Sequence, residues 1–356
     1  MRKPSSRPTI EDLARHLGVN KSTVSRAMDP ARRHLIGPQL LQRVDAAARE
    51  IGYRPNRVAA ALTTGRSGTI GVLVADVSNP WFAQMLRGIS DALDTEDYIT
   101  LLACTSRREG DTRTPATVVE RMLGQRVEGF LVTSAEIGDR WLDTLRGQAP
   151  VVLVNRTDGR DDLPAVVNDN RLGMKLAVDH LVGLGHRRIA HLAAPPRFST
   201  GRERREAFDT AMRAHGLDAG AVVECESYGI DYGHTAMTQL LARHAGTGRR
   251  AAAATAARPT AVIAANNTIA LGALQALKEQ GIACPAEISL VGHNDMLGMD
   301  QLAPPLTTVR MQHYEMGHRA ARLLLEALRA TPGSESTTIV LRPELIVSCS
   351  TAAPPR

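Results

Sequence analysis

The chain has 356 residues, of which 43% are hydrophobic and 22% are charged. These proportions indicate a globular protein of two or three domains and exclude a disordered or fibrous chain. The first nine residues, MRKPSSRPT, lack the apolar stretch of a signal peptide, and no apolar run approaches the ~18 residues of a membrane-spanning helix. We therefore expect a cytoplasmic protein whose four cysteines, none spaced as metal ligands, are buried free thiols.

The formal net charge of +6 is distributed unevenly along the sequence. Residues 1–66 contain 13 Lys and Arg against 5 Asp and Glu, whereas the remaining residues contain 30 against 32. The whole positive excess therefore lies in the first 66 residues. A protein that binds nucleic acid phosphates concentrates its positive charge in this way.

Residues 9–29, TIEDLARHLGVNKSTVSRAMD, predict two short helices joined by a turn. Thr9 and Asp12 have the spacing of a capping box, which starts a helix. Gly18 is suited to ending that helix, and Asn20 is suited to capping the next one. Two helices joined in this way form a helix-turn-helix, whose second helix fits the DNA major groove. The alternative for these residues alone is an ordinary helical hairpin with a solvated basic face.

The second of these helices has two faces. Val24, Ala27 and Met28 lie on one side at helical spacing and are expected to pack against the rest of the head. The polar residues that share the opposite face are Lys21, Ser22, Ser25 and Arg26. This polar face is the part of the helix-turn-helix that is expected to meet DNA.

The sequence after residue 38 predicts how the head connects to the rest of the chain. A third helix is expected at about residues 39–52, with an apolar face that completes a three-helix core. Residues 57–64, RVAAALTT, are good helix formers but too few for a helix stable alone in water, and GRSG after them resembles a linker. We therefore divide the chain into a DNA-binding domain at 1–55, a hinge helix and linker at 56–68, and a larger region at 69–356.

From Thr69 onward, short β-rich runs alternate with helical stretches, which predicts parallel sheets covered by helices on both faces. Nine strands exceed one comfortable domain, so two α/β lobes are expected. The expected strands are 69–77, 99–106, 129–135, 150–156, 165–169, 188–194, 221–227, 261–267 and 288–295. The expected helices include 81–94, 115–125, 170–184, 201–215, 232–244 and 268–280.

Many of these strands end in polar residues, and ligands of open α/β sheets bind beyond the C-terminal strand ends. Any single Asn or Asp in such a place is more commonly a turn or cap residue. Their repetition favours a cleft for a small polar solute between the lobes. The strand-end residues are Asp76, Thr133, Ser134, Asn155, Arg156, Asp169, Asn266, Asn267, Asn294 and Asp295.

At this point the sequence resembles the lactose-repressor/galactose-repressor (LacI/GalR) family of transcription regulators. The resemblance covers roughly residues 8–350 and is specific because several motifs occur in the family's order. They are TIEDLARHLGVNKSTVSRAMD, IGYRPNRVAAALTTGRSGTIGVLV, DVSNPWF, LVGLGHRRIAHLA, AVIAANNTIALGALQAL, EISLVGHND and PPLTTVR. It implies a helix-turn-helix head, a hinge helix and a two-lobed periplasmic-binding-protein-like domain for effector binding and dimerisation. It further implies a repressor, a homodimer or dimer of dimers, that binds a pseudo-palindromic operator under control of a sugar-like effector.

The resemblance assigns roles to residues of the head and hinge. Lys21, Ser22 and Arg26 match positions that read base edges in the family. Thr9, Thr23, Ser25 and Asn56 match positions that contact the DNA backbone; packing within the head is the alternative for Ser25. Ala59 and Leu62 match hinge-helix positions at the minor groove, where the Leu62 side chain would wedge into a base step.

The resemblance also assigns an effector site. The matching positions are Trp81, Phe82, Thr133, Asn155, Thr200, Arg204, Tyr228, Asn266 and Asn294. Asn294 and Asn267 stand where the family commonly has Asp, and this loss of charge would suit an acidic or phosphorylated sugar. The loop at 30–37 is also about two residues longer than the family's common form, and Gly37-Pro38 replaces its usual Ser or Thr cap.

Two other classes of protein could contain an α/β region of this kind. An enzyme is not expected, because the sequence contains no Walker A loop, GxSxG, HExxH or clustered His/Cys set, and no cofactor is predicted. A solute-binding protein for transport shares the two-lobed architecture, but the basic head and the missing signal sequence argue against it. A transcription activator controlled by an effector remains the alternative to a repressor.

Overall fold

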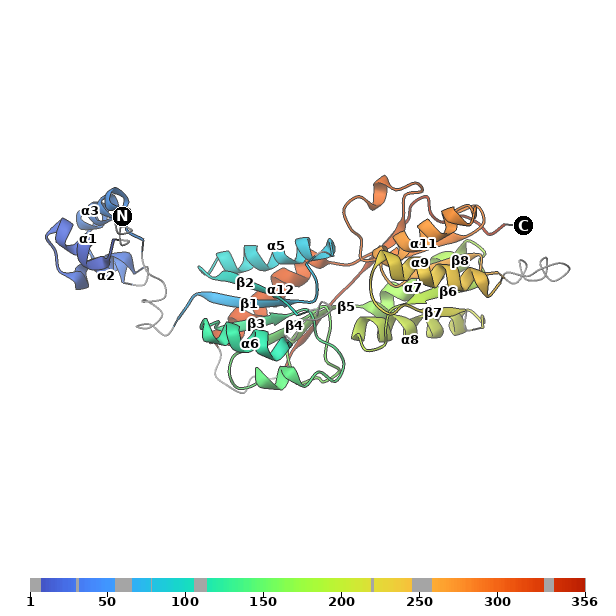
Figure 1. Ribbon diagram of the computed structural model, residues 1–356, viewed down its shortest axis with the longest axis horizontal. Coiled ribbons are helices and arrows are strands. Elements are labelled where there is room, and N and C mark those ends of the chain that lie inside the picture. Colours follow the sequence, from blue (N-terminus) through green and yellow to red (C-terminus); the bar gives the residue numbers. More distant parts are fainter. Residues whose placement is uncertain are drawn as a thin grey trace, which may run out of the picture. The chain divides into compact units, whose positions relative to one another are not determined.

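The computed structural model describes residues 8–29, 32–54, 66–77, 79–105, 114–218, 221–244, 258–329 and 336–355. The chain forms two compact units, Met1–Ser67 and Gly68–Arg356 (Figure 1). We call the first unit the head and the second the core. In the described ranges, no helix is long and apolar enough to cross a membrane. The predicted hinge helix at 57–64 lies outside the described residues.

The head is a three-helix cluster, as the sequence predicts. Its elements are α1 (Ile10–Leu17), α2 (Lys21–Met28), the short 3-10 helix η1 (Arg33–Leu35) and α3 (Pro38–Ile51). Leu13, Val24 and Val44, one from each α-helix, are fully buried at its centre. Burying an aliphatic side chain contributes about 1.5–3 kcal/mol, so a few such residues hold this small unit together.

The predicted caps of the head are present. The Thr9 side chain accepts a hydrogen bond from the Asp12 amide, and Asn20 accepts one from the Ser22 amide. Gly18 ends α1 in the left-handed conformation, with φ of 65°. The helix α3 has no side-chain cap, and instead Pro38 occupies its first position, where a missing amide proton costs nothing.

The core has two lobes, and we call the lobe that contains Thr69 and the first five strands of the core lobe 1. Its sheet has the order β11-β5-β4-β3-β1-β2 with every neighbouring pair parallel. The strands are β1 (Thr69–Val74), β2 (Ile99–Cys104), β3 (Gly129–Val132), β4 (Val151–Val154), β5 (Ala165–Asn168) and β11 (Thr338–Leu341). The helices are α5 (Trp81–Asp94), α6 (Pro115–Gly124), η2 (Trp141–Thr144) and α12 (His313–Arg329). Side chains alternate along each strand, so Val72 faces α5 and α12 while Leu73 faces α6 and η2.

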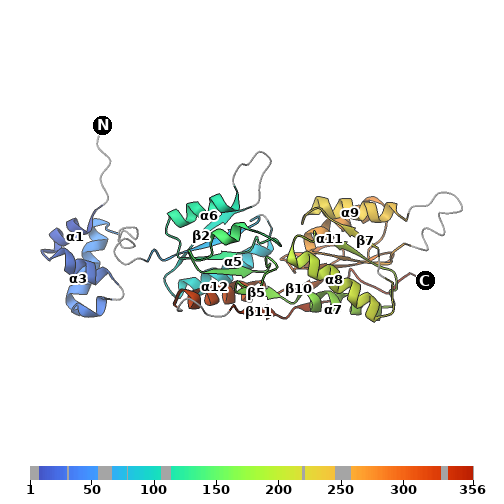
Figure 2. The ribbon, with the colours of Figure 1, turned by 90° about the horizontal axis from the view of Figure 1, so that it is seen from below.

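Lobe 2 repeats this architecture (Figures 1 and 2). Its sheet has the order β12-β10-β9-β8-β6-β7, parallel except for the edge pair β10 and β12. The strands are β6 (Ile189–Ala193), β7 (Val222–Glu224), β8 (Ala261–Ala264), β9 (Ser289–His293), β10 (Thr307–Arg310) and β12 (Glu344–Ile346). The helices α7 (Asn170–Gly183) and α8 (Ser199–Ala214) cover one face. The helices α9 (Ile230–Ala242) and α11 (Asn267–Glu279) cover the other.

Each lobe contains one pair of helices that approach closely at glycines. A Cβ atom at Gly88 in α5 would overlap the carbonyl oxygen of Tyr314, and one at Gly317 in α12 would overlap that of Met85. The pair α9 and α11 has the same arrangement. Only glycine allows two helix backbones to meet at this distance, so these positions fix both pairs.

The chain crosses between the lobes in three places: from β5 to α7, from β10 to α12, and from β11 to β12. Hydrogen bonds join the crossings. The Gln312 amide donates to the Asn168 side chain at 3.1 Å, and the Asp169 amide donates to the Leu341 carbonyl at 2.9 Å. The three connections therefore form one bonded hinge.

The two parallel-sheet lobes and all nine expected strands are present, but the sequence interpretation missed several elements. Strands β10, β11 and β12 and helix α12 were not predicted. The expectation for the cysteines was partly wrong. Cys225 is buried, but Cys104 and Cys349 are exposed.

Candidate functional site

The polar face of α2 is open to solvent. Lys21, Ser22, Ser25 and Arg26 are all exposed, whereas Val24 and Ala27 are fully buried on the other side. Thr23 is half-buried, and Thr9 is exposed at the start of α1. The exposure of Ser25 disfavours the alternative that it packs within the head. Asn56, Ala59 and Leu62, the other residues assigned to DNA contact, lie outside the described residues.

Lys21 pairs with a carboxylate of the head. Its Nζ lies 2.6 Å from the Glu11 carboxylate on α1, and this hydrogen bond lowers the pKa of Glu11. Both side chains are more than half exposed, so the pair is screened by water and exchangeable. The Lys21 ammonium can therefore leave Glu11 for a base edge or a phosphate.

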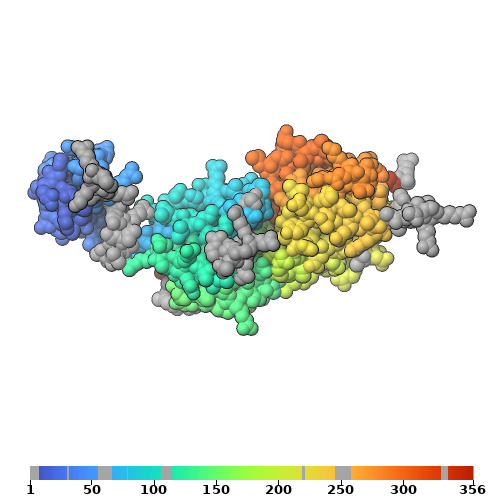
Figure 3. All heavy atoms as spheres, viewed as in Figure 1, coloured from blue at the N-terminus to red at the C-terminus, as the bar shows by residue number. Residues whose placement is uncertain are grey.

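The core contains a cavity of about 680 Å³ whose lining comes from both lobes. Figure 3 shows the lobes, cyan to green and yellow to orange, meeting along a seam. We call the lobe 1 side of the cavity wall 1 and the lobe 2 side wall 2. Eight of the nine residues assigned to the effector site line it: Trp81, Phe82 and Asn155 on wall 1, and Thr200, Arg204, Tyr228, Asn266 and Asn294 on wall 2.

Thr133, the ninth assigned residue, does not line the cavity. Its side chain is buried and donates a hydrogen bond to the Leu73 carbonyl at 3.1 Å. Its neighbour Ser134 lines the cavity instead. Successive side chains at a strand end point in opposite directions. An error of one residue in a predicted site position therefore selects a side chain that faces the core instead of the cavity.

Two cavity asparagines adopt a backbone conformation that most residues avoid. Asn155 follows β4 with φ of 69°, and Asn294 follows β9 with φ of 66°. Asn tolerates this left-handed region because its short amide can hydrogen-bond locally. These asparagines turn the chain sharply at the strand ends and bring the following residues to the cavity.

Arg204 is the most enclosed cation of wall 2, with only 1% of its surface exposed. Nε donates to the Asn170 side chain at 2.9 Å, one terminal nitrogen donates to the Ala265 carbonyl, and the other donates to Asn294 Oδ1 at 3.1 Å. Burial lowers the pKa of Arg204. Because Asn170 begins α7 directly after a crossing, Arg204 connects the cavity to the hinge.

Three other polar residues of wall 2, Thr200, Tyr228 and Asn266, are also bonded to protein partners. Asn266 caps α11 by accepting from the Ile269 amide at 2.8 Å, and Thr200 shares a 2.9 Å hydrogen bond with the Tyr228 hydroxyl. Asn267, one of the two residues that differ from the family's pattern, is fully buried away from the cavity and accepts from Thr308. The argument that its missing charge suits an acidic ligand is therefore wrong for Asn267.

Aromatic rings form two groups at the cavity. Trp81 and Phe82 stack with centroids 4.0 Å apart, and Trp81 also lies against His313. Phe198 and Tyr228 stack at 5.4 Å on the other wall. Both tryptophans of the chain, Trp81 and Trp141, line the cavity.

Several cavity residues were not assigned from the sequence. The most informative are Asn79, Ser134, Arg156, Arg197 and Phe198. Ser134 and Arg156 are among the polar strand-end residues of the sequence, so their position predicted a place near the cavity, but they were not assigned to the effector site. Phe198 and Arg197 lie in a loop with no pattern of its own and could be placed only by the fold.

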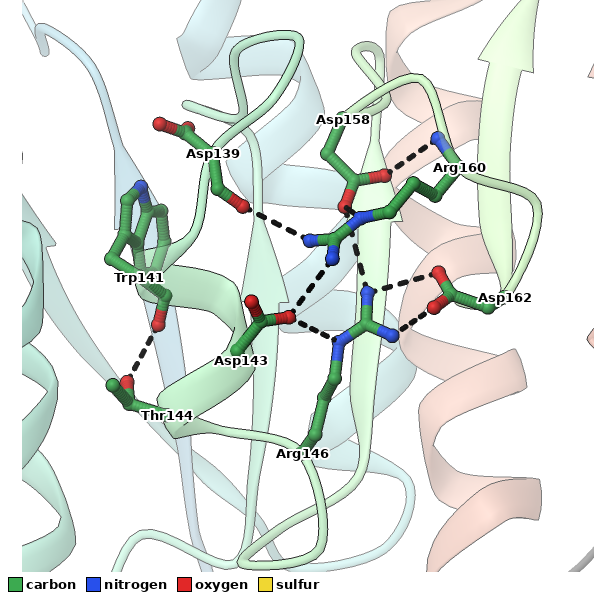
Figure 4. A network of polar contacts seen from close by, with 8 residues as sticks. All are labelled: Asp139, Trp141, Asp143, Thr144, Arg146, Asp158, Arg160 and Asp162. Carbon is green, nitrogen blue, oxygen red and sulfur yellow. Dashed lines mark hydrogen bonds and ion pairs between the residues drawn. The ribbon is translucent and has the colours of Figure 1, made fainter.

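A network of polar contacts fixes the two loops of wall 1 (Figure 4). Arg160 donates to the Asp158 carboxylate at 2.7 Å, to Asp143 at 3.0 Å and to the Asp139 carbonyl at 3.0 Å. Arg146 binds Asp162 and lies 3.6 Å from Asp158, whose carboxylate is fully enclosed. This network holds the segment after β3 against the segment after β4.

The lobes also contact each other at the rim of the cavity. The Ile137 amide donates to the Arg197 carbonyl at 2.9 Å, and the Thr157 amide donates to the Ser199 hydroxyl at 3.0 Å. Arg197 also pairs with Glu136 at 3.7 Å. These contacts are separate from the hinge, so the lobes are joined at two places around the cavity.

Comparisons with known proteins agree with this architecture. The profile described as "Bacterial regulatory proteins, lacI family" matches residues 9–56, and that of a "Periplasmic binding protein-like domain" matches residues 178–351. The transcriptional regulator GalS of Salmonella typhimurium is 33% identical over 325 residues, covering 91% of each chain.

Two solved structures have the same fold. A lac repressor dimer bound to operator and the anti-inducer ONPF has a TM-score of 0.82 and 25% identity, covering 98% of this chain and 100% of that one. The regulator CelR in complex with cellobiose has a TM-score of 0.69 and 28% identity, covering 97% and 100%. These relatives are regulators and not enzymes.

The basic helix-turn-helix, the two-lobed core with its cavity, and a relative that is similar over nearly the whole sequence lead to one conclusion. This chain belongs to the lacI family of bacterial regulatory proteins and is a DNA-binding transcriptional regulator.

Proposed function

We propose that the protein is a repressor, active as a homodimer, whose affinity for its operator is set by a sugar-like effector in the cavity between the lobes. The observation that carries this proposal is the cavity itself. Its walls come from both lobes, and Arg204 on wall 2 bonds to Asn170 at the hinge. A ligand that contacts both walls favours one lobe arrangement over another by its difference in affinity for the two.

The coupling follows from the bonds around the hinge. Arg204 and Asn170 share a hydrogen bond next to the crossing at Asp169, whose amide bonds to Leu341 of another crossing. A ligand that shifts Arg204 therefore acts directly on the connections between the lobes. Coupling between two sites commonly amounts to about 1–3 kcal/mol, or a 5- to 150-fold change in DNA affinity.

The sugar-like class of effector is supported by chemistry and by relatives. Stacked rings and amide side chains suit the apolar faces and hydroxyls of a saccharide. CelR was solved with cellobiose, and the lac repressor was solved as a dimer on its operator. We carry over the effector class, the dimer and repression, with the hinge residues Asn56, Ala59 and Leu62 completing the DNA contact.

The α2 face supports a specific reading of the operator. Arg26 suits a bidentate contact to guanine, while Lys21 and Ser22 lie beside it on the same exposed face. We expect Arg26→Ala to weaken specific binding by about 1–3 kcal/mol and to relax the preference at one base pair. Arg49→Ala, which removes an exposed cation of α3, is the matched control and should leave that preference unchanged.

The proposal is tested by measuring binding of the full chain to genomic fragments by fluorescence anisotropy at physiological salt. A pseudo-palindromic site should bind at least about 1,000-fold more tightly than unrelated DNA. Members of a panel of sugars, sugar acids and sugar phosphates should change that affinity. Equal binding to all sequences would refute the DNA-reading role, and a tight site that no panel member affects would refute the effector role.

A further inference from the structure

Arg156 is a cation of wall 1 that the assigned site did not include. It follows Asn155 at the end of β4, and only 9% of its surface is exposed. Its guanidinium carbon lies 4.0 Å from the centroid of Phe198 and 5.3 Å from that of Tyr228. Its Nε atom is buried and donates to no acceptor among the described residues. The guanidinium thus contacts ring faces of wall 2 and keeps hydrogen-bond donors free.

The carboxylates near Arg156 are engaged elsewhere. Asp158, two residues along the chain, is bound by Arg160 at 2.7 Å and lies 3.6 Å from Arg146 (Figure 4). Glu136 pairs with Arg197. Asp139 accepts a hydrogen bond from the Glu136 amide at 2.8 Å, and Asp76 is exposed to solvent. Of these carboxylates, Glu136 acts on Arg156 and raises its pKa, but Glu136 is shared with Arg197 and therefore offsets the Arg156 charge only in part.

A buried guanidinium whose charge is only partly offset is costly for the protein. Removing a charge from water disfavours it by several kcal/mol unless an opposite charge or hydrogen bonds replace the water. Burial lowers the pKa of Arg156, in agreement with this cost. The ring faces of Phe198 and Tyr228 offset part of this cost. A ligand anion would supply the missing opposite charge.

Two other polar groups of wall 1 also lack partners among the described residues. Asn79 Oδ1 is a buried acceptor, and Ser134 Oγ is a buried hydroxyl oxygen. Both residues line the same cavity as Arg156. A ligand that satisfies all three must offer an acceptor to Arg156 and a hydroxyl donor to Asn79. A polyhydroxylated organic anion has both.

We propose that the effector is a sugar-type organic anion, bearing a carboxylate or a phosphate, whose anionic group is bound by Arg156 while its hydroxyls bind Asn79 and Ser134. This inference rests on the proposed function, because it names the ligand of the same cavity. It assigns Arg156 to ligand recognition and to discrimination against neutral sugars.

The first test uses inorganic phosphate as the probe and the full chain. Both tryptophans line the cavity, so tryptophan fluorescence reports binding there. At constant ionic strength, phosphate up to 50 mM, an amount chosen to cover about millimolar affinities, should give a saturable change. Arg156→Gln should weaken this response at least about 10-fold, the loss expected for a charged hydrogen bond. Arg213→Gln, at an exposed position on α8, should leave it unchanged. The absence of saturation, or equal responses in wild type and Arg156→Gln, would overturn the proposal.

The second test compares glucose, gluconate and glucose 6-phosphate in the same fluorescence titration. An anionic member should bind at least about 10-fold more tightly than glucose, and Arg156→Gln should remove most of that preference. Preference for gluconate identifies a carboxylate, and preference for glucose 6-phosphate identifies a phosphate. If glucose binds as well as both anions and Arg156→Gln changes nothing, the inference fails. In that case the proposed function still stands if glucose changes operator binding. The effector part of the proposed function fails as well if no ligand changes operator binding.

Discussion

The two walls of the cavity use a buried arginine in opposite ways. Arg204 on wall 2 donates to three protein acceptors, whereas Arg156 on wall 1 has a buried donor with no acceptor in the described chain. Both are nearly enclosed, so burial does not explain the difference. The Arg204 guanidinium is bonded on all three nitrogens without a ligand and is tied to the hinge through Asn170. Wall 1 retains free donors and acceptors, so its bonding can be completed only by something that enters the cavity.

The largest expected effect is a difference in stability between variants of the two arginines. Arg204→Met removes the donor to Asn170, Ala265 and Asn294 and leaves buried acceptors unpaired, so the free energy of unfolding should fall by about 3–5 kcal/mol. Arg156→Met removes a buried charge that the protein offsets only in part. The free energy of unfolding should therefore fall by less than about 1 kcal/mol, or should rise. Denaturant unfolding followed by tryptophan fluorescence measures both. Equal losses would mean that Arg156 is as fully bonded as Arg204.

The second prediction concerns pH and lobe 2. Burial lowers the pKa of His191 from 6.5 to about 4, with Arg204 and Arg205 adding to the effect. The unfolded chain therefore takes up this proton at a higher pH than the folded one. The stability that neutral His191 contributes is complete above pH 6.5 and is lost as pH falls toward about 4. This contribution is on the order of a few kcal/mol.

Unfolding by urea at several pH values tests this dependence. Asn can donate to the Ile263 carbonyl as His191 does, so His191→Asn should keep that bond and make the profile between pH 6.5 and 4 less steep. Part of the slope should remain, because burial also lowers the pKa of His293 and His313. A His191→Asn profile as steep as that of the wild type would assign the pH dependence to other groups.

The smallest expected effect separates two adjacent residues of lobe 1. Ser134→Ala removes a cavity hydroxyl without a protein partner and should weaken effector binding about 3- to 10-fold, with little change in stability. Thr133→Val removes the hydrogen bond to the Leu73 carbonyl and should cost under about 1 kcal/mol of stability while leaving effector affinity unchanged. Titration and unfolding of the two variants give the comparison. The reverse pattern would place Thr133, and not Ser134, at the ligand.

The sequence predicted the features that depend on local patterns. The capping box at Thr9, the turn at Gly18 and the cap at Asn20 are decided by neighbouring residues, and all three are present. Strand-end polarity identified where a cavity forms. Thr133 was misplaced because its direction depends on the position at which β3 ends, which a one-residue error reverses. The sequence could not predict that Arg156 Nε lacks an acceptor among the described residues. The nearby Asp158 is bound by Arg160 and Arg146, which only the fold brings to it.

The missed elements have a common cause. Helix α12 follows a crossing and returns to lobe 1, far along the sequence from β1–β5, so its partner could not be read from neighbouring residues. The strands β10–β12 are short, and β11 and β12 are separated by two residues yet belong to different sheets. Local periodicity indicates what a segment forms but not which sheet it joins.

The return of α12 and β11 to lobe 1 also affects the order in which the protein can fold during its synthesis. Domains generally fold as units as the chain leaves the ribosome. Lobe 1 cannot do so, because α12 covers the face shared with α5 and β11 forms its sheet edge, and both are made after nearly all of lobe 2. The apolar face of α5, including Met85 and Ile89, must therefore wait until residue 329 has emerged. During this interval the exposed apolar face of α5 is open to non-native contacts, which favour aggregation.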